Sequence, residues 1–415
     1  MKVKQLIPVQ KEIEIDKLIE QFNNEYTLRV HDNLVVEFAN SVSKSVLKNK
    51  LLRQFPAFVS LAYWLRKSNF KFLIASALSS NNENIQLKPL GAVLHICPSN
   101  VDTMFVYSLF LSLLSGNKNI LRISSKLDSQ EIDELFNILS SELSREEFIK
   151  INNYITVIAY GYEREVNEKL SLSVDCRLIW GGDSTVEMFK GLKTKIKTKD
   201  FYFADRVSCC IIVASTYLEL SENSKNDFTQ KFYNDTYTFD QKGCSSPQII
   251  LILGTSEEYC EFKNNFKLKL HQFVSREYIY DPMSLASLKL NKLSEDAIER
   301  TIASYDSVNN SLIFCELTGD NIPHSCGGGY FYIKNIEEIN QLKNFFSQNI
   351  QTISQLGLSH SQIEFLVQSS YGQGVDRIVN VGKALEFNPT WDGYDLLQEL
   401  TSKLFVEKQN FKYRT

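Results

Sequence analysis

The chain has 415 residues, 43% of them apolar, so it exceeds what one hydrophobic core usually organises and two domains are expected. It carries 45 Lys and Arg against 49 Asp and Glu, a formal net charge of −4, with no long block of one sign. This charge balance does not favour a nucleic-acid partner.

The N-terminal stretch MKVKQLIPVQKEIEIDK soon becomes polar and lacks the apolar run of a signal peptide, so we expect a cytoplasmic protein. The longest apolar run, VDTMFVYSLFLSLLSG, opens with Asp102 after one valine and is shorter than the roughly 20 residues of a bilayer span. We therefore expect a buried helix and no membrane span.

The eight cysteines are scattered along the chain without a CxxC pair, so the sequence predicts neither a zinc site nor a disulfide framework. In a reducing compartment most of them should be small core residues. They are Cys97, Cys176, Cys209, Cys210, Cys244, Cys260, Cys315 and Cys326.

The chain up to about Leu90 is predicted to be helical, because residues 15–26 and 55–70 carry apolar side chains at three- and four-residue spacing. The polar run SSNNEN at 79–84 then predicts a loop.

From Leu90 onward, short apolar runs alternate with helical stretches. The predicted strands are 91–98, 119–124, 154–160 and 176–182. Between the first two lies a predicted helix, 101–115, which Gly116 would end in the C′ position that favours glycine. Strand, helix and strand at this spacing predict parallel pairing in a Rossmann-like α/β sheet.

A second series of strands follows the basic segment KTKIKTKD. The predicted strands are 206–214, 247–254 and 328–336. This series predicts a second α/β domain, with the boundary near residue 200.

Cys244 lies in FDQKGCSSPQ, between a predicted helix at 224–240 and a predicted strand. An exposed turn lets a thiol meet a substrate, and Gly243 permits close approach of another backbone. A free thiol has a pKa near 8.5, so a catalytic cysteine needs N–H dipoles or a cation nearby. The backbone amides of Cys244 and Ser245 could supply them. The alternative is a buried, inert sulfur.

Asn100 follows the first strand of the Rossmann-like sheet, at the carboxyl edge where α/β proteins bind ligands. Its amide could donate to a developing oxyanion. Equally, it could cap the helix that begins near Val101, and the two roles are compatible.

Two further strand ends could contact a dinucleotide. The segment LRISSK contains no acidic residue to bind ribose hydroxyls, which favours NADP(H) over NAD(H), although exposed cations are often only solvated. Its polar residues are Arg122, Ser124, Ser125 and Lys126. In WGGDSTVEMFKG a glycine pair leads into a helix whose N-terminus could face a pyrophosphate, although such turns are common.

The five histidines form no zinc or triad pattern. His95 lies within a predicted strand and is expected to be a hydrogen-bonded core residue. His324 and His360 lie in loop-like contexts, where they are candidate proton carriers, although structural roles are commoner.

Several of these motifs occur in the order found in the aldehyde dehydrogenase superfamily. FDQKGC resembles its nucleophile segment, with Gln241 and Cys244 at the matching positions. CSSPQ and the ending GVDRIVNVGKALEFNPTWDGYDLL resemble the acyl-CoA reductase family that includes the fatty acid reductase of bacterial luminescence. The resemblance runs from FPAFVSLAYWLRKSNF to WDGYDLL, which is most of the chain.

The resemblance implies an aldehyde dehydrogenase-like α/β fold and NADPH-dependent reduction of an acyl thioester to an aldehyde. Cys244 would carry the acyl group, CoA would enter as part of the substrate, and Asn100 would match the oxyanion-binding asparagine. Arg122 stands where the superfamily usually has a ribose-contacting lysine, and Ser125 where many NAD-using members have a glutamate. Gly182 and Ser184 match the Gly-Ser turn beside the cofactor pyrophosphate.

The resemblance also implies a domain plan. Residues 1–203 would form an N-terminal helical segment and an NADP(H)-binding Rossmann-like domain, and residues 204–375 a catalytic domain. Residues 376–415 would return to the core or to a subunit interface. A homo-oligomer is expected, and an acyl-donating partner enzyme is a further candidate. Trp391 could line the active site or pack structurally, and Arg377 could bind a phosphate or pair with a carboxylate.

One departure from the superfamily bears on the reaction. Aldehyde-oxidising members carry a general-base glutamate, but the corresponding stretch here is FADRVSCC. The missing glutamate argues against hydrolysis of the acyl-enzyme to a free acid. Asp205 lies nearby in the sequence, however, and could act as a substitute base. Two alternatives therefore stay open: an NAD(P)-dependent aldehyde dehydrogenase that makes a free acid, and a non-catalytic binding protein on the same fold.

Overall fold

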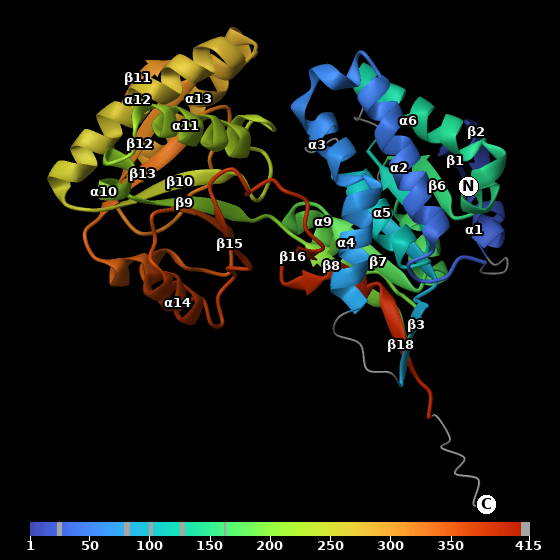
Figure 1. The fold of residues 1–415 in the computed structure, drawn as a ribbon. Coiled ribbons are helices and arrows are strands. Elements are labelled where there is room, and N and C mark those ends of the chain that lie inside the picture. Colours follow the sequence, from blue (N-terminus) through green and yellow to red (C-terminus); the bar gives the residue numbers. More distant parts are fainter. Residues whose placement is uncertain (23–26, 79–83, 99–102, 125–128, 162, 408–415) are drawn as a thin grey trace, which may run out of the picture. The chain divides into compact units, whose positions relative to one another are not determined.

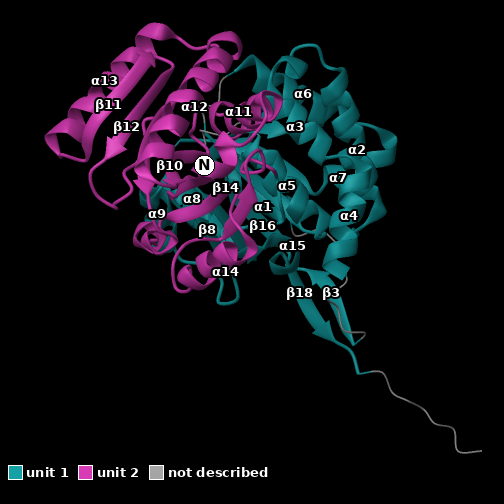
Figure 2. Ribbon diagram, turned by 60° about the vertical axis from the view of Figure 1, so that its left-hand side comes forward, with its two compact units in different colours: residues 1–204, 387–415 teal, residues 205–386 magenta. Residues whose placement is uncertain are grey.

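The computed structural model describes residues 1–22, 27–78, 84–98, 103–124, 129–161 and 163–407 (Figure 1). The chain forms two compact units: unit 1 comprises residues 1–204 and 387–415, and unit 2 comprises residues 205–386 (Figure 2). The chain passes from unit 2 back into unit 1 after Glu386. The C-terminal segment was expected to begin earlier, at residue 376. Three candidate site residues lie outside the described residues: Asn100, Ser125 and Lys126.

Unit 1 contains a seven-stranded sheet with the order β2-β1-β6-β5-β4-β7-β8. Its parallel strands are β4 (Ala92–Ile96), β5 (Lys118–Ile123), β6 (Ile155–Ala159), β7 (Cys176–Trp180) and β8 (Lys199–Phe203). The first four confirm the strands predicted in this part of the chain. In sequence order the five strands are arranged 3-2-1-4-5, so the winding reverses between β4 and β7. Doubly wound sheets bind ligands at the carboxyl ends of strands at such a reversal.

Both faces of this sheet are covered by helices, which explains why its strands are continuous apolar runs. On one face lies α5 (Met104–Leu114), which is buried along its whole length, as expected for the longest apolar run. Its Phe110 stacks on Phe38 of α2 (Asn33–Lys48) with ring centroids 5.5 Å apart. The opposite face packs with side chains of α1 (Ile15–Phe22), α8 (Arg164–Ser173) and α9 (Asp183–Lys190).

The other described helices in residues 1–204 of unit 1 are α1 (Ile15–Phe22), α2 (Asn33–Lys48), α3 (Pro56–Trp64), α4 (Lys67–Leu78), α6 (Gln130–Leu143), α7 (Ile149–Asn152), α8 (Arg164–Ser173) and α9 (Asp183–Lys190), with 3-10 turns η1 (Leu52–Gln54) and η2 (Glu146–Phe148). None of the described helices in either unit has both the length and the apolar composition that crossing a bilayer requires.

The helical prediction for the first ninety residues is wrong in three places, which form β1 (Lys2–Ile7), β2 (Lys11–Glu14) and β3 (Ile85–Pro89). Strand β1 alternates buried and exposed side chains and pairs antiparallel with β6. Strand β3 pairs with β18 (Thr401–Phe405), from the other end of the sequence. The backbone hydrogen bonds of these segments are thus made with strands that are remote in sequence. Their local residue patterns are too short to distinguish a strand from a helix.

Unit 2 contains a second seven-stranded sheet, in the order β11-β12-β13-β10-β9-β14-β15. The strands are β9 (Val207–Val213), β10 (Pro247–Leu253), β11 (Ile302–Asn309), β12 (Leu312–Leu317), β13 (Tyr330–Ile336), β14 (Ile350–Leu356) and β15 (Arg377–Asn380). All neighbours pair in parallel except the edge strand β11. The second α/β domain and the predictions for β9, β10 and β13 are confirmed.

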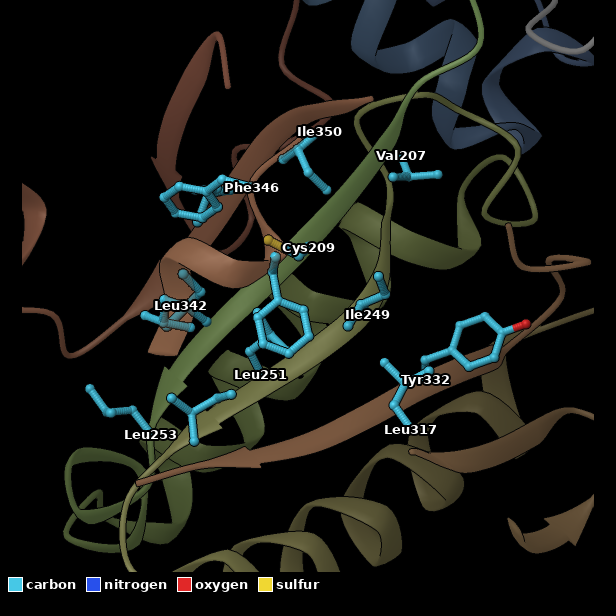
Figure 3. Packing of buried hydrophobic residues seen from close by; sticks show 14 of the residues in the cluster. Val207, Cys209, Ile249, Leu251, Leu253, Leu317, Tyr332, Leu342, Phe346 and Ile350 are labelled. Carbon is cyan, nitrogen blue, oxygen red and sulfur yellow. The ribbon is translucent and has the colours of Figure 1, made fainter. Parts of the chain in front are cut away.

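Each face of this second sheet has its own apolar core. Helices α10 (Ala214–Leu218), α11 (Glu222–Tyr237) and α12 (Ser256–Glu277) pack on one face. Residues of α13 (Pro282–Ile298), η3 (Ile339–Phe345) and α14 (His360–Ser369) pack on the other, around the residues shown in Figure 3. Because strand side chains alternate, Cys209 joins the core of Figure 3 and Cys210 joins the opposite one.

The C-terminal segment packs within unit 1. Strands β16 (Thr390–Trp391) and β17 (Tyr394–Asp395) form a short hairpin, followed by α15 (Leu396–Glu399). Asp392 and Gly393 at its turn both have positive φ angles, 47° and 77°, which an Asp-Gly pair tolerates. Trp391 is buried, with its ring centroid 5.8 Å from that of Tyr107 in α5. In unit 1 this motif therefore contributes to the core.

Candidate functional site

Cys244 lies in the connection between α11 and β10, residues 238–246, which we call the Cys244 turn. Its side chain is partly exposed. The backbone N–H of Gln241 donates to the Thr236 carbonyl at 2.7 Å, and that of Ser246 donates to the Gly243 carbonyl at 2.9 Å. These bonds join the turn to the end of the preceding helix and close it before the strand begins.

Gln241 fixes this turn to the neighbouring strand. Its side chain is buried, and its Oε1 accepts from the backbone N–H groups of Gly329 at 2.7 Å and Tyr330 at 3.1 Å. Its Nε2 donates to the Pro247 carbonyl at 3.1 Å. Gln241 has a φ angle of 60°, which is an uncommon backbone conformation for a residue other than glycine. The surrounding hydrogen bonds hold the residue in this conformation.

Three glycines, Gly327, Gly328 and Gly329, form the loop that receives Gln241. All have positive φ angles, between 61° and 85°. A Cβ on Gly327 would overlap the carbonyl oxygen of Asp240, whose own hydrogen-bond donor is the Gly328 N–H at 2.9 Å. The glycines are therefore required by backbone angle and by close approach to the Cys244 turn.

A buried serine holds the Cys244 backbone itself. Ser208, near the start of β9, donates its hydroxyl to the Cys244 carbonyl at 2.6 Å. The Ser208 Oγ in turn accepts from the backbone N–H of Thr352 in β14 at 3.1 Å. The position of Cys244 is thus tied to two strands as well as to the glycine loop.

The other seven cysteines lie in different surroundings. Five are buried: Cys97, Cys176, Cys209, Cys210 and Cys315. Burial raises the pKa of all five thiols, to about 12 for Cys209, which keeps them protonated and inert. Burial also raises the pKa of Cys326 to about 11, and Cys260 is exposed on α12.

In unit 1 the candidate cofactor residues lie at the carboxyl ends of β5 and β7. Arg122 donates from Nη2 to the Gly161 carbonyl at 3.0 Å, and its guanidinium lies 5.4 Å from the centroid of the Tyr160 ring. Ser124 follows, half-buried. Gly182 is the N-cap of α9, and Ser184 is exposed in the first turn.

His95 is a core residue, as expected, and its proton can be assigned. The side-chain amide of Asn119 donates to the Asn117 carbonyl at 2.8 Å, so its Oδ1 faces His95 Nε2, 3.0 Å away. His95 therefore donates from Nε2, and its Nδ1 accepts from Ser108 at 2.7 Å. Ser108 Oγ accepts from the indole N–H of Trp180 at 3.1 Å. Burial lowers the pKa of His95 to about 4.

The remaining candidates lie on other segments of unit 2. His324 is exposed in the loop before β13, and His360 is exposed at the start of α14. Asp205 is exposed at the first residue of unit 2. Arg377 binds backbone carbonyls, at 3.2 Å for Ala384 and 3.3 Å for Lys383. Within the described part of the chain, no group of three or more His, Cys, Asp or Glu could hold a metal ion.

The glycine loop and Ser208, which hold the turn together with Gln241, were not predicted from the sequence. The run SCGGGY was a usable signal, because three successive glycines imply an unusual backbone. Ser208 had no comparable signal, since a serine within an apolar strand has no distinguishing pattern.

A sequence model of the family described as "Acyl-CoA reductase (LuxC)" matches residues 15–403. The chain belongs to this family. It is accordingly an oxidoreductase that acts on acyl or aldehyde groups. A comparison with curated proteins gave no match.

Solved structures of aldehyde dehydrogenases share the fold. An aldehyde dehydrogenase of Mycobacterium tuberculosis in complex with NAD⁺ has a TM-score of 0.65 and 9% identity, covering 96% of this chain and 92% of its own. Aldehyde dehydrogenase 21 of Physcomitrella patens, in complex with the product succinate, has a TM-score of 0.64 and 11% identity, covering 96% and 91%. The fold expected from the sequence is confirmed.

Proposed function

We propose that this member of the LuxC family reduces acyl-CoA to an aldehyde with NADPH, through an acyl group held covalently on Cys244. The observation that carries the proposal is the Cys244 turn. It presents a partly exposed thiol on a backbone tied to α11, β9 and the glycine loop. A nucleophile held in this way is restricted to a narrow range of positions, which favours attack on a bound carbonyl.

In the first step the Cys244 thiolate attacks the thioester carbonyl, and the carbonyl electrons move to oxygen. The oxyanion is stabilised by the Cys244 backbone N–H and by the Asn100 side-chain amide, which the resemblance matches to the superfamily's oxyanion donor. Collapse of this intermediate breaks the bond to CoA, whose thiolate leaves. Cys244 then carries the acyl group as a new thioester.

In the second step the acyl group on Cys244 is reduced. NADPH, when bound, would supply a hydride to the acyl carbon. The Cys244 backbone N–H and the Asn100 side-chain amide would stabilise the oxygen of the thiohemiacetal that forms on Cys244. Collapse of this alkoxide breaks the carbon–sulfur bond, releases the aldehyde and leaves the Cys244 sulfur as the thiolate with which the first step began.

The described residues of unit 1 fit a nicotinamide dinucleotide. The winding of the sheet reverses between β4 and β7, and doubly wound sheets commonly bind ligands at the carboxyl ends of such strands. The N-terminus of α9 at Gly182 follows β7, which supports the proposal that a pyrophosphate binds there. Neither Arg122 nor Ser124, at the end of β5, has an acidic side chain that would repel a 2′-phosphate. Together with the proposed Ser125 and Lys126, they support NADPH over NADH.

The absence of a glutamate in 203–210 supports reduction over oxidation to a free acid. A general base beside the acyl-cysteine would activate water and hydrolyse it. Asp205 is the carboxylate in this stretch. A homo-oligomer and an acyl-donating partner enzyme stay predictions from the resemblance.

The test is intact-mass analysis of the protein with a panel of acyl-CoA thioesters, with and without NADPH. We expect an acyl adduct that maps to Cys244 and is discharged as aldehyde when NADPH is added. Cys244→Ala should remove the adduct and lower turnover by at least about a thousandfold, because the covalent route is lost. Cys260→Ala, at the exposed cysteine on α12, is the matched control and should behave as wild type.

Turnover retained in Cys244→Ala would exclude the covalent mechanism. Aldehyde oxidation without CoA, giving a free acid, would instead favour a dehydrogenase. No adduct with any thioester, and no turnover, would favour a non-catalytic binding protein.

A further inference from the structure

A short loop in unit 2, residues 382–386, is bonded by side chains along both of its backbone edges. On one edge, Asp235 of α11 accepts from the backbone N–H of Gly382 at 2.6 Å and of Ala384 at 3.0 Å. On the other, Arg377 of β15 donates to the carbonyls of Ala384 and Lys383. We call residues 382–386 the clamped loop.

The clamped loop contacts the Cys244 turn through one side chain. A Cβ built on Gly243 would lie 3.4 Å from Cδ2 of Leu385. Leu385 therefore packs over the backbone of the residue that immediately precedes Cys244. Gly243 itself is buried, so its contact with Leu385 is part of the buried packing next to Cys244.

Asp235 also lies next to the other support of the turn. It occupies the last turn of α11, and the adjacent Thr236 carbonyl accepts the N–H of Gln241. One side chain thus joins the helix that leads into the Cys244 turn to the loop that packs against it.

The surroundings of Asp235 disfavour a charged carboxylate. Its side chain is buried, and a carboxylate near a helix C-terminus faces the negative end of the helix dipole. Burial raises the pKa of Asp235 to about 7, Glu386 acts in the same direction, and the backbone amides of the clamped loop oppose both. An apolar side chain would avoid these costs but could not bind the loop amides.

We propose that Asp235 is a positioning residue for Cys244: by holding the clamped loop it keeps Leu385 against Gly243, and so keeps the thiol in the geometry needed for acyl transfer. The proposal rests on the proposed function, because it assigns Asp235 a role in the reaction of Cys244.

The first experiment measures the acylation rate of Cys244 by an acyl-CoA in Asp235→Asn. An asparagine keeps the shape but turns an NH₂ group or a weaker acceptor toward the loop amides. We expect acylation to slow by about tenfold to a hundredfold, as for a misplaced reactive group. Hydrogen exchange of residues 382–386 should become faster, whereas alkylation of Cys244 by iodoacetamide, which needs no defined geometry, should stay within about twofold.

The matched control is Glu222→Gln, at the first residue of α11 and therefore at the opposite end of the helix from Asp235. Glu222 is exposed and pairs with Lys269 of α12 at 2.7 Å. This variant should acylate at the wild-type rate.

A second variant, Leu385→Ala, keeps both hydrogen bonds of Asp235 but removes the contact with Gly243. It should slow acylation to a similar degree while leaving exchange at Gly382 and Ala384 slow. If Asp235→Asn does not fold, this variant decides: acylation at the wild-type rate would overturn the proposal. Wild-type acylation in a folded Asp235→Asn would overturn it as well.

The two proposals fail differently. If the wild-type protein forms no adduct on Cys244, the proposed function fails. If the wild type is acylated and the variants are acylated equally fast, only the positioning role of Asp235 fails.

Discussion

Individual buried polar residues fix the backbone near the candidate site residues of each unit through their side-chain hydrogen bonds. His95, Gln241 and Asp235 are all almost completely buried, and each has hydrogen-bond partners on its side chain. A buried polar group is costly unless it is bonded, so each constrains its neighbours to one arrangement. Gln241 and Asp235 act on the Cys244 turn, whereas His95 joins β4 to β5, α5 and β7.

His95 should make stability depend on pH. Its folded-state pKa of about 4 lies below the unfolded value of 6.5, so between these values the unfolded chain binds more protons. The free energy of unfolding should therefore fall as pH decreases from 6.5 towards 4, by up to about 3 kcal/mol from this group. Chemical denaturation across this pH range measures it.

The comparison is with His95→Gln, which should lack this component of the pH dependence. His360→Gln, at a histidine whose side chain is 89% exposed, is the control and should retain the wild-type slope. Equal slopes in wild type and His95→Gln would contradict the assignment.

At the scale of elements, the glycine loop and the Cys244 turn are joined to each other by hydrogen bonds. The loop, at the start of β13, supplies N–H groups to Gln241 and to the Asp240 carbonyl. The turn, at the start of β10, supplies the acceptors. Because β10 and β13 are paired neighbours in the sheet, their register brings the two connections together.

Gly329→Ala should test this arrangement. A Cβ at this position would overlap the Ser311 carbonyl and the Tyr237 hydroxyl, which are themselves hydrogen-bonded at 2.9 Å. We expect a loss of about 3 kcal/mol or more in the free energy of unfolding and slower acylation of Cys244. Chemical denaturation and the acylation assay measure the two effects.

Gly372→Ala separates backbone strain from overlap. Gly372 has a φ angle of 76°, close to the 85° of Gly329, but a Cβ there has no neighbour within 4 Å. It should cost about 1 kcal/mol and leave acylation unchanged. Equal losses in the two variants would show that crowding at the glycine loop is unimportant.

At the scale of the whole molecule, the chain's two ends belong to the same compact unit. Residues after Glu386 return to unit 1, where Asn117 donates to the Leu400 carbonyl at 2.9 Å and β18 pairs with β3. Phe387 stacks on Tyr107 of α5 with ring centroids 5.1 Å apart. The core of unit 1 is therefore incomplete until residues 387–407 are in place.

Truncation after Glu386 should consequently destabilise unit 1 more than unit 2. We expect faster hydrogen exchange in β4, β5 and α5, with smaller changes in β9 and β10. A chain that ends at Glu407, the last described residue, is the control and should exchange as the full chain does. Equal protection of β4 and β5 in the two truncated proteins would contradict the role assigned to residues 387–407.

The sequence alone determined those features that depend on short windows. Continuous apolar runs predicted β4, β7, β9 and β10, because strands buried on both faces need no polar alternation. The motif FDQKGC placed Cys244 in a turn between a helix and a strand, and the structure has it there. The family resemblance extended this local information to the fold and to the class of reaction.

Only the tertiary structure decided how Cys244 is held. Ser208, the glycine loop, Asp235 and Arg377 lie far from one another in sequence, and their contacts depend on strand register and on a loop returning along α11. The strands β1 and β3 were missed for the same reason, because their partners are remote. A local pattern reflects propensity and periodicity, whereas a hydrogen bond between distant residues exists only once the packed core has brought them together.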